Sequence, residues 1–255
     1  MPINTQIQVK QVVSDGTSLL VHSIFYTIQG EGIFAGRPAV FIRLAGCNLQ
    51  CPACDTEYTA NAKEMYVWDI EAIVRHKAIN TSTLVVITGG EPFRQSLGKL
   101  IDNLTNLFGY DVQIETNGTL FDDSINYDNK KLFIMCSPKT GSINKKLAPH
   151  ITAYKYVGGC DERAIPYGSL MDNLDPHGLE NHSLALDGLP RQALGHSAVP
   201  ILARPPAGFQ GKIFLQPIDR QDPELNKFHQ QVVVESCMQH GYTLCLQIHK
   251  IIEVE

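Results

Sequence analysis

Short apolar runs, many of them β-branched, alternate along the chain with segments of helical spacing. This alternation is typical of a parallel sheet whose strands are joined by crossover helices. The expected strands are residues 20–27, 39–44, 84–88, 112–116, 132–136, 153–157, 213–216 and 242–248. Helices are expected within 68–79, 94–109 and 222–241, with Gly109 and Gly241 as stops for the last two. The sequence therefore predicts an α/β fold of repeated βα units.

Polar or glycine-containing motifs stand at or just after the carboxyl ends of most expected strands. They are Arg43 with "AGC", "TGGEP" (88–92), "ETNG" (115–118), "SPK" (137–139), Lys155, "QP" (216–217) and "IHK" (248–250). In a barrel or open sheet of parallel strands these ends converge on one face, where loops carry the chemistry. We therefore expect one functional face at the carboxyl edge of the sheet.

The length of 255 residues suits one α/β domain or at most two small ones, and we expect one domain over residues 1–255. Residues from about 161 to 210 contain six prolines and little periodicity. We treat them as a Pro-rich insertion whose fold the sequence does not assign.

Composition excludes several classes of protein. Hydrophobic residues make up 44% and charged residues 18%, as in ordinary globular proteins, and no apolar run is long enough to cross a bilayer. The N-terminus lacks a basic segment followed by an apolar one, so we expect no secretory signal and a cytoplasmic protein. A formal charge of −5 argues against a large nucleic-acid surface. We expect neither nucleic-acid nor membrane binding.

Three of the seven cysteines, Cys47, Cys51 and Cys54, lie within eight positions. In a reducing compartment such clustering points to metal ligation or catalysis rather than disulfides. Thiolates at this spacing bind zinc or an iron–sulfur cluster, and three ligands leave one metal position open. A structural zinc knot is the alternative, although no Cys or His between Cys54 and His76 supplies its fourth ligand. The remaining cysteines are expected to be buried thiols: Cys136, Cys160, Cys237 and Cys245.

The C-x-x-x-C-x-x-C loop followed by "GGEP" resembles the radical S-adenosylmethionine superfamily. There, three cysteines hold a [4Fe-4S] cluster and S-adenosylmethionine chelates the fourth iron. An electron from the cluster cleaves the sulfonium, and a 5′-deoxyadenosyl radical abstracts a substrate hydrogen. A larger group of sequence motifs resembles the 7-carboxy-7-deazaguanine synthase family over residues 25–159 and 211–255. These motifs are "FYTIQGEGIFAGRPAVFIRLAGCNLQCPACDTEY", "TGGEP", "ETNG", "SPK", "YKYV", "LQP" and the terminal "HK".

This resemblance implies a partial or modified (β/α) barrel and a ring contraction. The substrate would be 6-carboxy-5,6,7,8-tetrahydropterin and the product 7-carboxy-7-deazaguanine, with loss of ammonia, in the queuosine and 7-deazapurine pathway. The implied cofactors are a [4Fe-4S] cluster, S-adenosylmethionine and Mg²⁺, and the implied partners are a flavodoxin or ferredoxin electron donor and a second copy in a homodimer. Two alternatives remain: a radical activase acting on a partner protein, and a non-catalytic zinc-binding module.

The resemblance also implies which residues meet the cofactors. Cys47, Cys51 and Cys54 would bind the cluster, and Thr56 matches the magnesium ligand, a hard oxygen donor. Without the resemblance, Thr56 would be taken for a cap or turn residue. Gly90 permits close backbone approach, although two adjacent glycines equally suit a tight turn. The positions expected to contact S-adenosylmethionine are Ala53, Cys54, Asp55, Gly90, Ser137, Pro138, Lys139 and Gln216.

Further positions are implied for the substrate: Ile28, Gln29, Gly30, Glu31, Arg43, Thr88, Glu115, Asn117, Lys155, His249 and Glu255. A pterin edge needs an amide donor and acceptor, and a carboxylate suits a bidentate guanidinium. The alternative for Arg43 is an ion pair with Glu31 or Glu115. Glu31 is alternatively a turn carboxylate. Satisfied structural polar groups are the alternative for Glu115, Asn117, Lys155 and His249.

Overall fold

A computed structural model of the protein describes residues 4–51, 54, 56–80, 82–159 and 202–254. Its described part forms one nine-stranded sheet. The strands are β1 Ser18–Ile28, β2 Pro38–Leu44, β3 Lys63–Tyr66, β4 Leu84–Gly89, β5 Asp111–Thr116, β6 Leu132–Cys136, β7 Ala153–Gly158, β8 Lys212–Pro217 and β9 Thr243–Leu244. The α-helices are α1 Val67–Lys77, α2 Gly98–Asp102, α3 Pro223–His240 and α4 Ile248–Ile251. Single 3₁₀ turns occupy Gly32–Phe34, Pro92–Arg94 and Ala148–His150.

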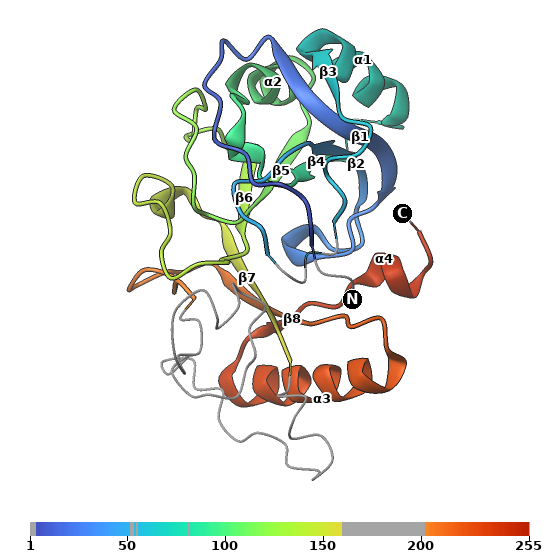
Figure 1. Ribbon diagram of the computed structural model, residues 1–255, viewed down its shortest axis with the longest axis vertical. Coiled ribbons are helices and arrows are strands. Elements are labelled where there is room, and N and C mark those ends of the chain that lie inside the picture. Colours follow the sequence, from blue (N-terminus) through green and yellow to red (C-terminus); the bar gives the residue numbers. More distant parts are fainter. Residues whose placement is uncertain (1–3, 52–53, 55, 81, 160–201, 255) are drawn as a thin grey trace.

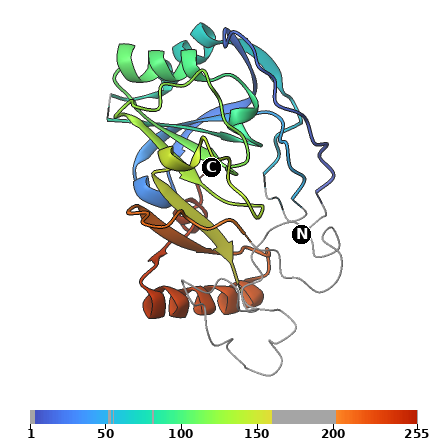
Figure 2. The same cartoon turned by 90° about the vertical axis from the view of Figure 1, so that its left-hand side faces the viewer.

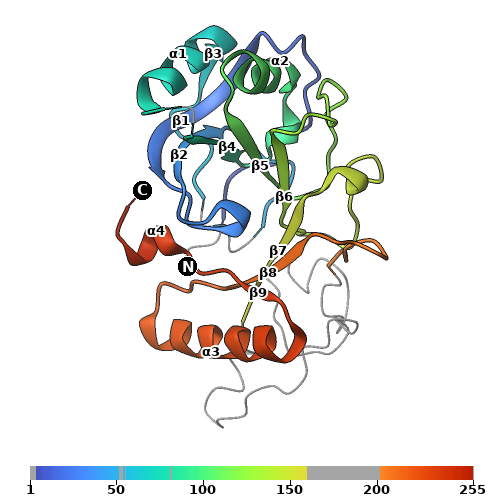
Figure 3. The same cartoon turned by 180° about the vertical axis from the view of Figure 1, so that it is seen from behind.

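The strand order is β3-β1-β2-β4-β5-β6-β7-β8-β9, and all pairs from β2 to β9 are parallel. Strand β1 is antiparallel to both β2 and β3, so the sheet is not purely parallel. Among the described strands β3 and β9 are the two edges, and no pairing closes the sheet between them (Figures 1 and 3). The predicted partial barrel is therefore confirmed.

The main hydrophobic core lies on the outer face of the sheet. Strand periodicity explains this placement, since Val40, Ile42 and Leu44 of β2 are buried in that core while Phe41 and Arg43 point to the opposite, concave face. Helix α1 contacts β1 and β3, and α3 contacts β8 and β9. Figures 1 and 2 show α1 and α2 at one end of the molecule and α3 at the other, with strands between them.

The concave face changes character along its strands. Two small apolar clusters fill its floor, one of Ala39, Leu84 and Val86 and one of Met135, Ala153, Phe214 and Cys245. Toward the carboxyl ends the same face becomes polar: the parallel register places Arg43 opposite Thr88, and β7 and β8 contribute Lys155 and Gln216. The fold therefore gathers polar side chains at one rim.

The C-terminal segment differs from the predicted strand over 242–248. Only Thr243–Leu244 pairs with the sheet, and α4 begins at Ile248. The reason is a competing backbone partner: the amide of Ile248 donates to the carbonyl of Gly30 at 3.1 Å and not to β8. The chain thus leaves the sheet to bind the loop that follows β1.

The segment 94–109 was predicted as one helix but is broken. Gln95 is extended, and its side chain holds both backbone groups of Leu20, accepting from N at 2.6 Å and donating to O at 3.0 Å. Helix α2 begins only at Gly98 and continues as a π-helix over Asn103–Leu107. Strand β3 was not predicted, since its polar sequence "KEMY" lies at an edge with little burial.

Other predicted boundaries are confirmed. Helix α3 ends at Gly241, which adopts a left-handed conformation with φ of 73°, and Gly109 follows the π-helix with φ of 77°. Asp222 caps α3, as its Oδ1 accepts from the amides of Glu224 and Leu225 at 3.0 and 3.1 Å. Within the described residues, no helix combines the length and apolar character that a bilayer crossing requires.

The end of β4 is packed so closely that it should not tolerate a side chain. Gly89 has φ of +135°, and a Cβ there would lie 2.1 Å from the carbonyl oxygen of Leu44. We expect Gly89→Ala to lower the free energy of unfolding by about 3 kcal/mol or more, measured by urea denaturation. Gly36 is the matched control, because its φ of +90° is also unusual but its Cβ would meet open space. Gly36→Ala should cost about 1–2 kcal/mol; equal losses would contradict the steric explanation.

Candidate active site

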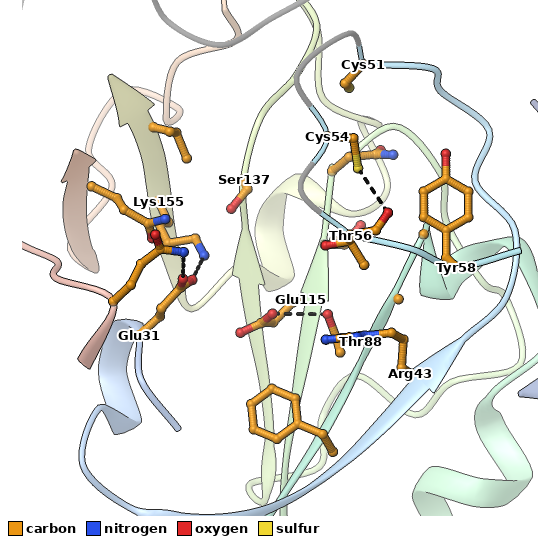
Figure 4. Close-up of a pocket in the computed structure, with 18 of the residues that line it drawn as sticks. Glu31, Arg43, Cys51, Cys54, Thr56, Tyr58, Thr88, Glu115, Ser137 and Lys155 are labelled. Atoms are coloured by element: carbon orange, nitrogen blue, oxygen red, sulfur yellow. Dashed lines mark hydrogen bonds and ion pairs between the residues drawn. The ribbon is translucent and has the colours of Figure 1, made fainter. Parts of the chain in front are cut away.

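A cavity of about 520 Å³ opens at the carboxyl ends of the parallel strands. Most residues expected at the site line it: Ile28, Gln29, Glu31, Arg43, Cys47, Cys51, Cys54, Thr56, Thr88, Gly90, Glu115, Asn117, Ser137, Lys139, Lys155, Gln216 and His249. Figure 4 shows how several of them point into the same space. Gly30 and Pro138 are buried behind the lining. Three further expected residues lie outside the described part of the chain: Ala53, Asp55 and Glu255.

The cysteine loop leaves the carboxyl end of β2 and is bonded to its neighbours. The amide of Gly46 donates to Tyr58 O at 3.1 Å, and the carbonyl of Gly46 accepts from the amide of Glu91 at 3.0 Å. Cys47 is buried, whereas Cys51 and Cys54 are partly exposed. Burial raises the pKa of the Cys47 thiol to about 12, so its thiolate needs a compensating positive charge, which a bound metal supplies.

The donor set suits a cluster better than a single ion. Outside the gaps in the described chain, no three His, Cys, Asp or Glu side chains form a group that could hold one metal ion. A structural zinc knot, which needs four ligands around one point, therefore has no support among these residues. In a cubane cluster each iron takes its own thiolate, so the sulfurs surround a volume. Three cysteines on the wall of one cavity fit that requirement.

The expected buried thiols are found where their sequence surroundings indicated. Cys136, Cys237 and Cys245 are buried and free. Cys136 and Cys237 belong to the main core, and Cys245 lies in the small cluster on the concave floor. Cys160 lies outside the described residues.

The glycine pair after β4 lies directly against the cysteine loop. A Cβ on Gly90 would be 2.3 Å from the carbonyl oxygen of Gly46 and 2.9 Å from Cβ of Cys47. The pair therefore serves as a tight turn and also brings the backbone of the "TGGEP" loop onto the cysteine loop.

Glu91 is a buried strut that sequence reasoning did not single out. Its Oε1 accepts from Thr116 Oγ1 at 2.7 Å and from the amide of Phe93 at 3.1 Å, while Oε2 accepts from the amide of Asn117 at 2.7 Å. Burial raises the pKa of Glu91 to about 7, against the opposing effect of these hydrogen bonds. The side chain thus ties the loop after β4 to the loop after β5.

Asn117 belongs to a chain of side-chain amides. It donates through Nδ2 to Asn48 Oδ1 at 3.0 Å, and Asn48 donates through Nδ2 to Thr119 Oγ1 at 2.8 Å. Thr119 returns two hydrogen bonds to Oδ1 of Asn117, at 2.9 and 2.6 Å. Because Asn48 follows Cys47 directly, this chain anchors the cysteine loop to the end of β5. The structural alternative for Asn117 therefore has clear support.

Arg43 stands at the carboxyl end of β2, and none of the carboxylates in the described part of the chain forms an ion pair with it. Its guanidinium lies 5.2 Å from the ring centroid of Phe25, which stacks on Phe41 at 5.3 Å. Within the described residues it makes no ion pair with Glu31 or Glu115, and its Nε is buried with no hydrogen-bond partner. The ion-pair alternative is thus wrong. A buried donor without a partner is costly, so this arrangement favours a ligand that brings acceptor oxygens.

Glu31 and Lys155 form a largely buried ion pair on the side of the cavity away from Cys54 and Tyr58 (Figure 4). Gln247 Nε2 also donates to Glu31 at 2.9 Å. Burial opposes the charge on Glu31, but Lys155 and Gln247 together lower its pKa below the ordinary carboxyl value. Burial likewise disfavours charged Lys155, and Glu31 outweighs it and raises the lysine pKa. Burial lowers the pKa of the neighbouring His249, which favours a neutral imidazole.

Glu115 lies at the centre of the concave face among neutral donors. Its carboxylate accepts from Thr88 Oγ1, Gln29 Nε2 and Gln113 Nε2, each at 3.1 Å. The Oε1 of Gln29 in turn accepts from the amide of Glu31 at 3.0 Å. This network fixes the orientations of the Gln29 amide and the Glu115 carboxylate relative to each other. It thereby joins the loop that follows β1 to strand β5.

Several lining residues were missed by sequence reasoning: Phe25, Phe41, Tyr58, Asp219 and Gln247. Strand periodicity could have found Phe41, which lies two residues before Arg43 and hence on the same face. The same spacing relates Tyr58 to Thr56. Gln247 and Asp219 carry no such signal, because their place at the cavity depends on how the C-terminal segment folds back.

Comparison with known proteins agrees with this geometry. The Radical SAM superfamily profile matches residues 41–134. The chain is 37% identical over 251 residues to the 7-carboxy-7-deazaguanine synthase of Rhodospirillum rubrum, with 94% of each chain covered. It is also 37% identical to the synthase of Rickettsia prowazekii, covering 94% of this chain and 91% of the relative.

A solved structure shows the same fold. The crystal structure of QueE from Escherichia coli superposes with a TM-score of 0.61 at 24% identity, covering 90% of this chain and 93% of the other. Sequence identity and coverage together establish the family: the chain belongs to the 7-carboxy-7-deazaguanine synthases of the radical S-adenosylmethionine superfamily.

Proposed function

We propose that the protein catalyses the ring contraction of 6-carboxy-5,6,7,8-tetrahydropterin to 7-carboxy-7-deazaguanine, with loss of ammonia, for queuosine and 7-deazapurine biosynthesis. Family membership supports the reaction class. The observation that carries the proposal is a cavity lined both by the three cysteines and by Arg43, whose buried Nε has no hydrogen-bond partner in the described part of the chain. Such a cavity provides a place for a radical-generating cofactor beside a place for a small carboxylate.

The proposed cofactor side of the cavity contains the cysteine loop and the loops after β4, β6 and β8. Cys47, Cys51 and Cys54 would hold a [4Fe-4S] cluster, and S-adenosylmethionine would lie against Gly90, Ser137, Lys139 and Gln216. When bound, the cluster and S-adenosylmethionine supply the one-electron chemistry that removes a substrate hydrogen. The buried strut of Glu91 and the packing of Gly90 hold these loops in place beforehand.

The proposed substrate side lies across the concave face. Arg43 would bind the pterin carboxylate, with the stacked rings of Phe25 and Phe41 as an apolar wall beside it. Gln29 and Glu115, held by one network, would present an amide and a carboxylate to the donor and acceptor edge of the pterin. The Glu31–Lys155 pair lies on the opposite wall, and its charges balance each other.

Magnesium, the partners and the compartment are also part of the proposal. Thr56 lines the cavity and offers a hydroxyl oxygen, so Mg²⁺ would complete its shell with substrate oxygens and water. A flavodoxin or ferredoxin would deliver the electron, and the protein would act as a homodimer. A cytoplasmic location would suit the described cysteines, which form no disulfide, since a reducing compartment keeps thiols from oxidising.

The test of the reaction is direct. The reconstituted protein is incubated anaerobically with the tetrahydropterin, S-adenosylmethionine and a reductant, and products are identified by mass spectrometry. Formation of 7-carboxy-7-deazaguanine without a protein partner supports the synthase and argues against the activase. Absence of an iron–sulfur absorbance band after reconstitution would favour the zinc-binding module.

Replacing a cluster ligand should remove the cofactor. Cys51→Ala should abolish both cluster retention and turnover, because two protein thiolates hold a [4Fe-4S] cluster poorly. Iron and sulfide content and product formation are measured after identical reconstitution. Cys237→Ala is the matched control, since Cys237 is a thiol of the outer core away from the cavity. Near-normal iron content in Cys51→Ala would overturn the cluster assignment.

Arg43→Lys should weaken substrate binding although the charge is kept. An ammonium cannot reproduce the planar two-point contact of a guanidinium with a carboxylate. We expect a loss of about 1.5–3 kcal/mol in kcat/KM, expressed mainly in KM. Arg75→Lys is the control, because Arg75 also lies over a phenylalanine ring, at 5.0 Å from Phe108, but outside the cavity. Unchanged kinetics for Arg43→Lys would assign Arg43 a structural role.

Thr56→Val should separate magnesium binding from cluster binding. Valine keeps nearly the same shape but lacks the hydroxyl oxygen, so the variant should retain its cluster and bind S-adenosylmethionine. It should lose most of the rate increase that added Mg²⁺ gives the parent enzyme, because the metal would no longer orient substrate. Thr56→Ser should recover part of that increase. A valine variant that responds to Mg²⁺ like the parent would rule out Thr56 as a ligand.

A further inference from the structure

The N-terminal segment runs along the cysteine loop although it contains no helix or full strand. We call residues 4–14 the N-terminal strap. The amide of Val9 donates to the carbonyl of Cys47 at 2.8 Å, and Gln8 forms an isolated parallel bridge with the same residue. Figure 2 shows the dark-blue strap running beside the light-blue segment that carries the cysteine loop. The strap therefore adds a backbone partner at the first cluster ligand.

The strap is itself anchored outside the cysteine loop. The amide of Val12 donates to Arg94 O at 2.7 Å. The side-chain amide of Gln11 donates to two carbonyls, those of Phe93 and Phe121, at 2.8 and 2.7 Å. These bonds attach residues 11 and 12 of the strap to the loops after β4 and β5. The preceding residues of the strap lie along the cysteine loop.

Two side-chain amides at the free end hold the second half of the loop. Asn4 Nδ2 donates to the carbonyl of Cys51 at 3.0 Å. Gln6 makes a two-point contact: Nε2 donates to the carbonyl of Thr56 at 2.9 Å, and Oε1 accepts from the amide of Tyr58 at 2.9 Å. A primary amide that bonds the carbonyl of one residue and the amide two residues later reproduces the pattern of a neighbouring β-strand.

This contact has a consequence for the cavity. A segment held in a strand-like conformation directs side chains two residues apart to the same side. Thr56 and Tyr58 both line the cavity, on the side of the cysteines (Figure 4). We propose that Gln6 is a positioning residue that holds residues 56–58 so that Thr56 and Tyr58 face the cavity, and that the strap thereby preorganises the cysteine loop for its cluster.

We call the two-point contact of Gln6 with Thr56 and Tyr58 the clamp. It is a property of the polypeptide, and only its effect on the cluster rests on the proposed function. Gln8 provides a matched control, since it has the same side chain two positions further along the strap. Its side chain is exposed and, within the described residues, makes no hydrogen bond to the loop. Gln6→Leu removes both halves of the contact, whereas Gln6→Glu keeps the shape and the acceptor but sets a carboxylate oxygen against the carbonyl of Thr56.

The first measurement is hydrogen exchange of the cluster-free full-length protein, followed by mass spectrometry. Gln6→Leu and Gln6→Glu should each exchange roughly tenfold faster in peptides covering residues 47–58, as expected for the loss of one or two hydrogen bonds. Peptides from α3 should be unchanged, and the melting temperature should stay within about 4 °C of the parent. Gln8→Leu should match the parent throughout. Parent-like exchange in both Gln6 variants would overturn the proposal.

The second measurement is cluster release from reconstituted protein, followed anaerobically by absorbance after addition of an iron chelator. Both Gln6 variants should release iron roughly tenfold faster than the parent and Gln8→Leu. Slow release from Gln6→Glu alone would show that the site needs bulk and not a donor, which contradicts the clamp. If the parent binds no cluster, the proposed function fails, while the exchange experiment still decides whether Gln6 holds the loop.

Discussion

The parallel register of β2, β4, β5, β6, β7 and β8 is the constraint on which the site depends. Each strand buries one face in the outer core and ends at the same rim. A polar side chain near the end of a strand therefore faces the concave side of the sheet at this rim. Arg43, Thr88 and Lys155 come from distant parts of the sequence but reach one cavity for this reason. This arrangement also places polar groups close to the hydrophobic core. Each of these groups therefore needs a hydrogen-bond or ion-pair partner.

Most of those partners are found within the protein, and the exception is informative. Glu31 is paired with the charge of Lys155, whereas Glu115 and Glu91 each accept three hydrogen bonds from neutral donors. Among the described charged residues that line the cavity, Arg43 has a buried nitrogen without a hydrogen-bond partner, whereas Arg94, whose Nε is also unpartnered, lies outside the lining. A fold that satisfies its carboxylates but leaves a guanidinium open selects for an anionic ligand, because the binding of an anion removes a penalty that the empty site carries.

Sequence patterns predicted the elements whose causes are local. The β-branched strands and the left-handed stop at Gly241 follow from neighbours in the chain, as does the tight turn at the adjacent glycines. The break before α2 and the early end of β9 did not follow, because Gln95 bonds Leu20 and Ile248 bonds Gly30 across the fold. For the site, motif resemblance indicated the cavity residues, but it could not indicate Glu91 or Asn48, whose roles are set by hydrogen-bond partners distant in sequence.

The cysteine loop combines these themes. Its thiols gain little from the protein alone, since burial raises the pKa of Cys47 and opposes the thiolate that a cluster requires. The order of the loop must therefore come from groups other than the ligands, and the described structure offers three: the Asn48–Asn117 chain, the Glu91 strut beside Gly46, and the N-terminal strap. Each bonds the loop through backbone or side-chain amides and not through the cysteine sulfurs. Order established in this way lowers the conformational entropy that ligand binding must overcome.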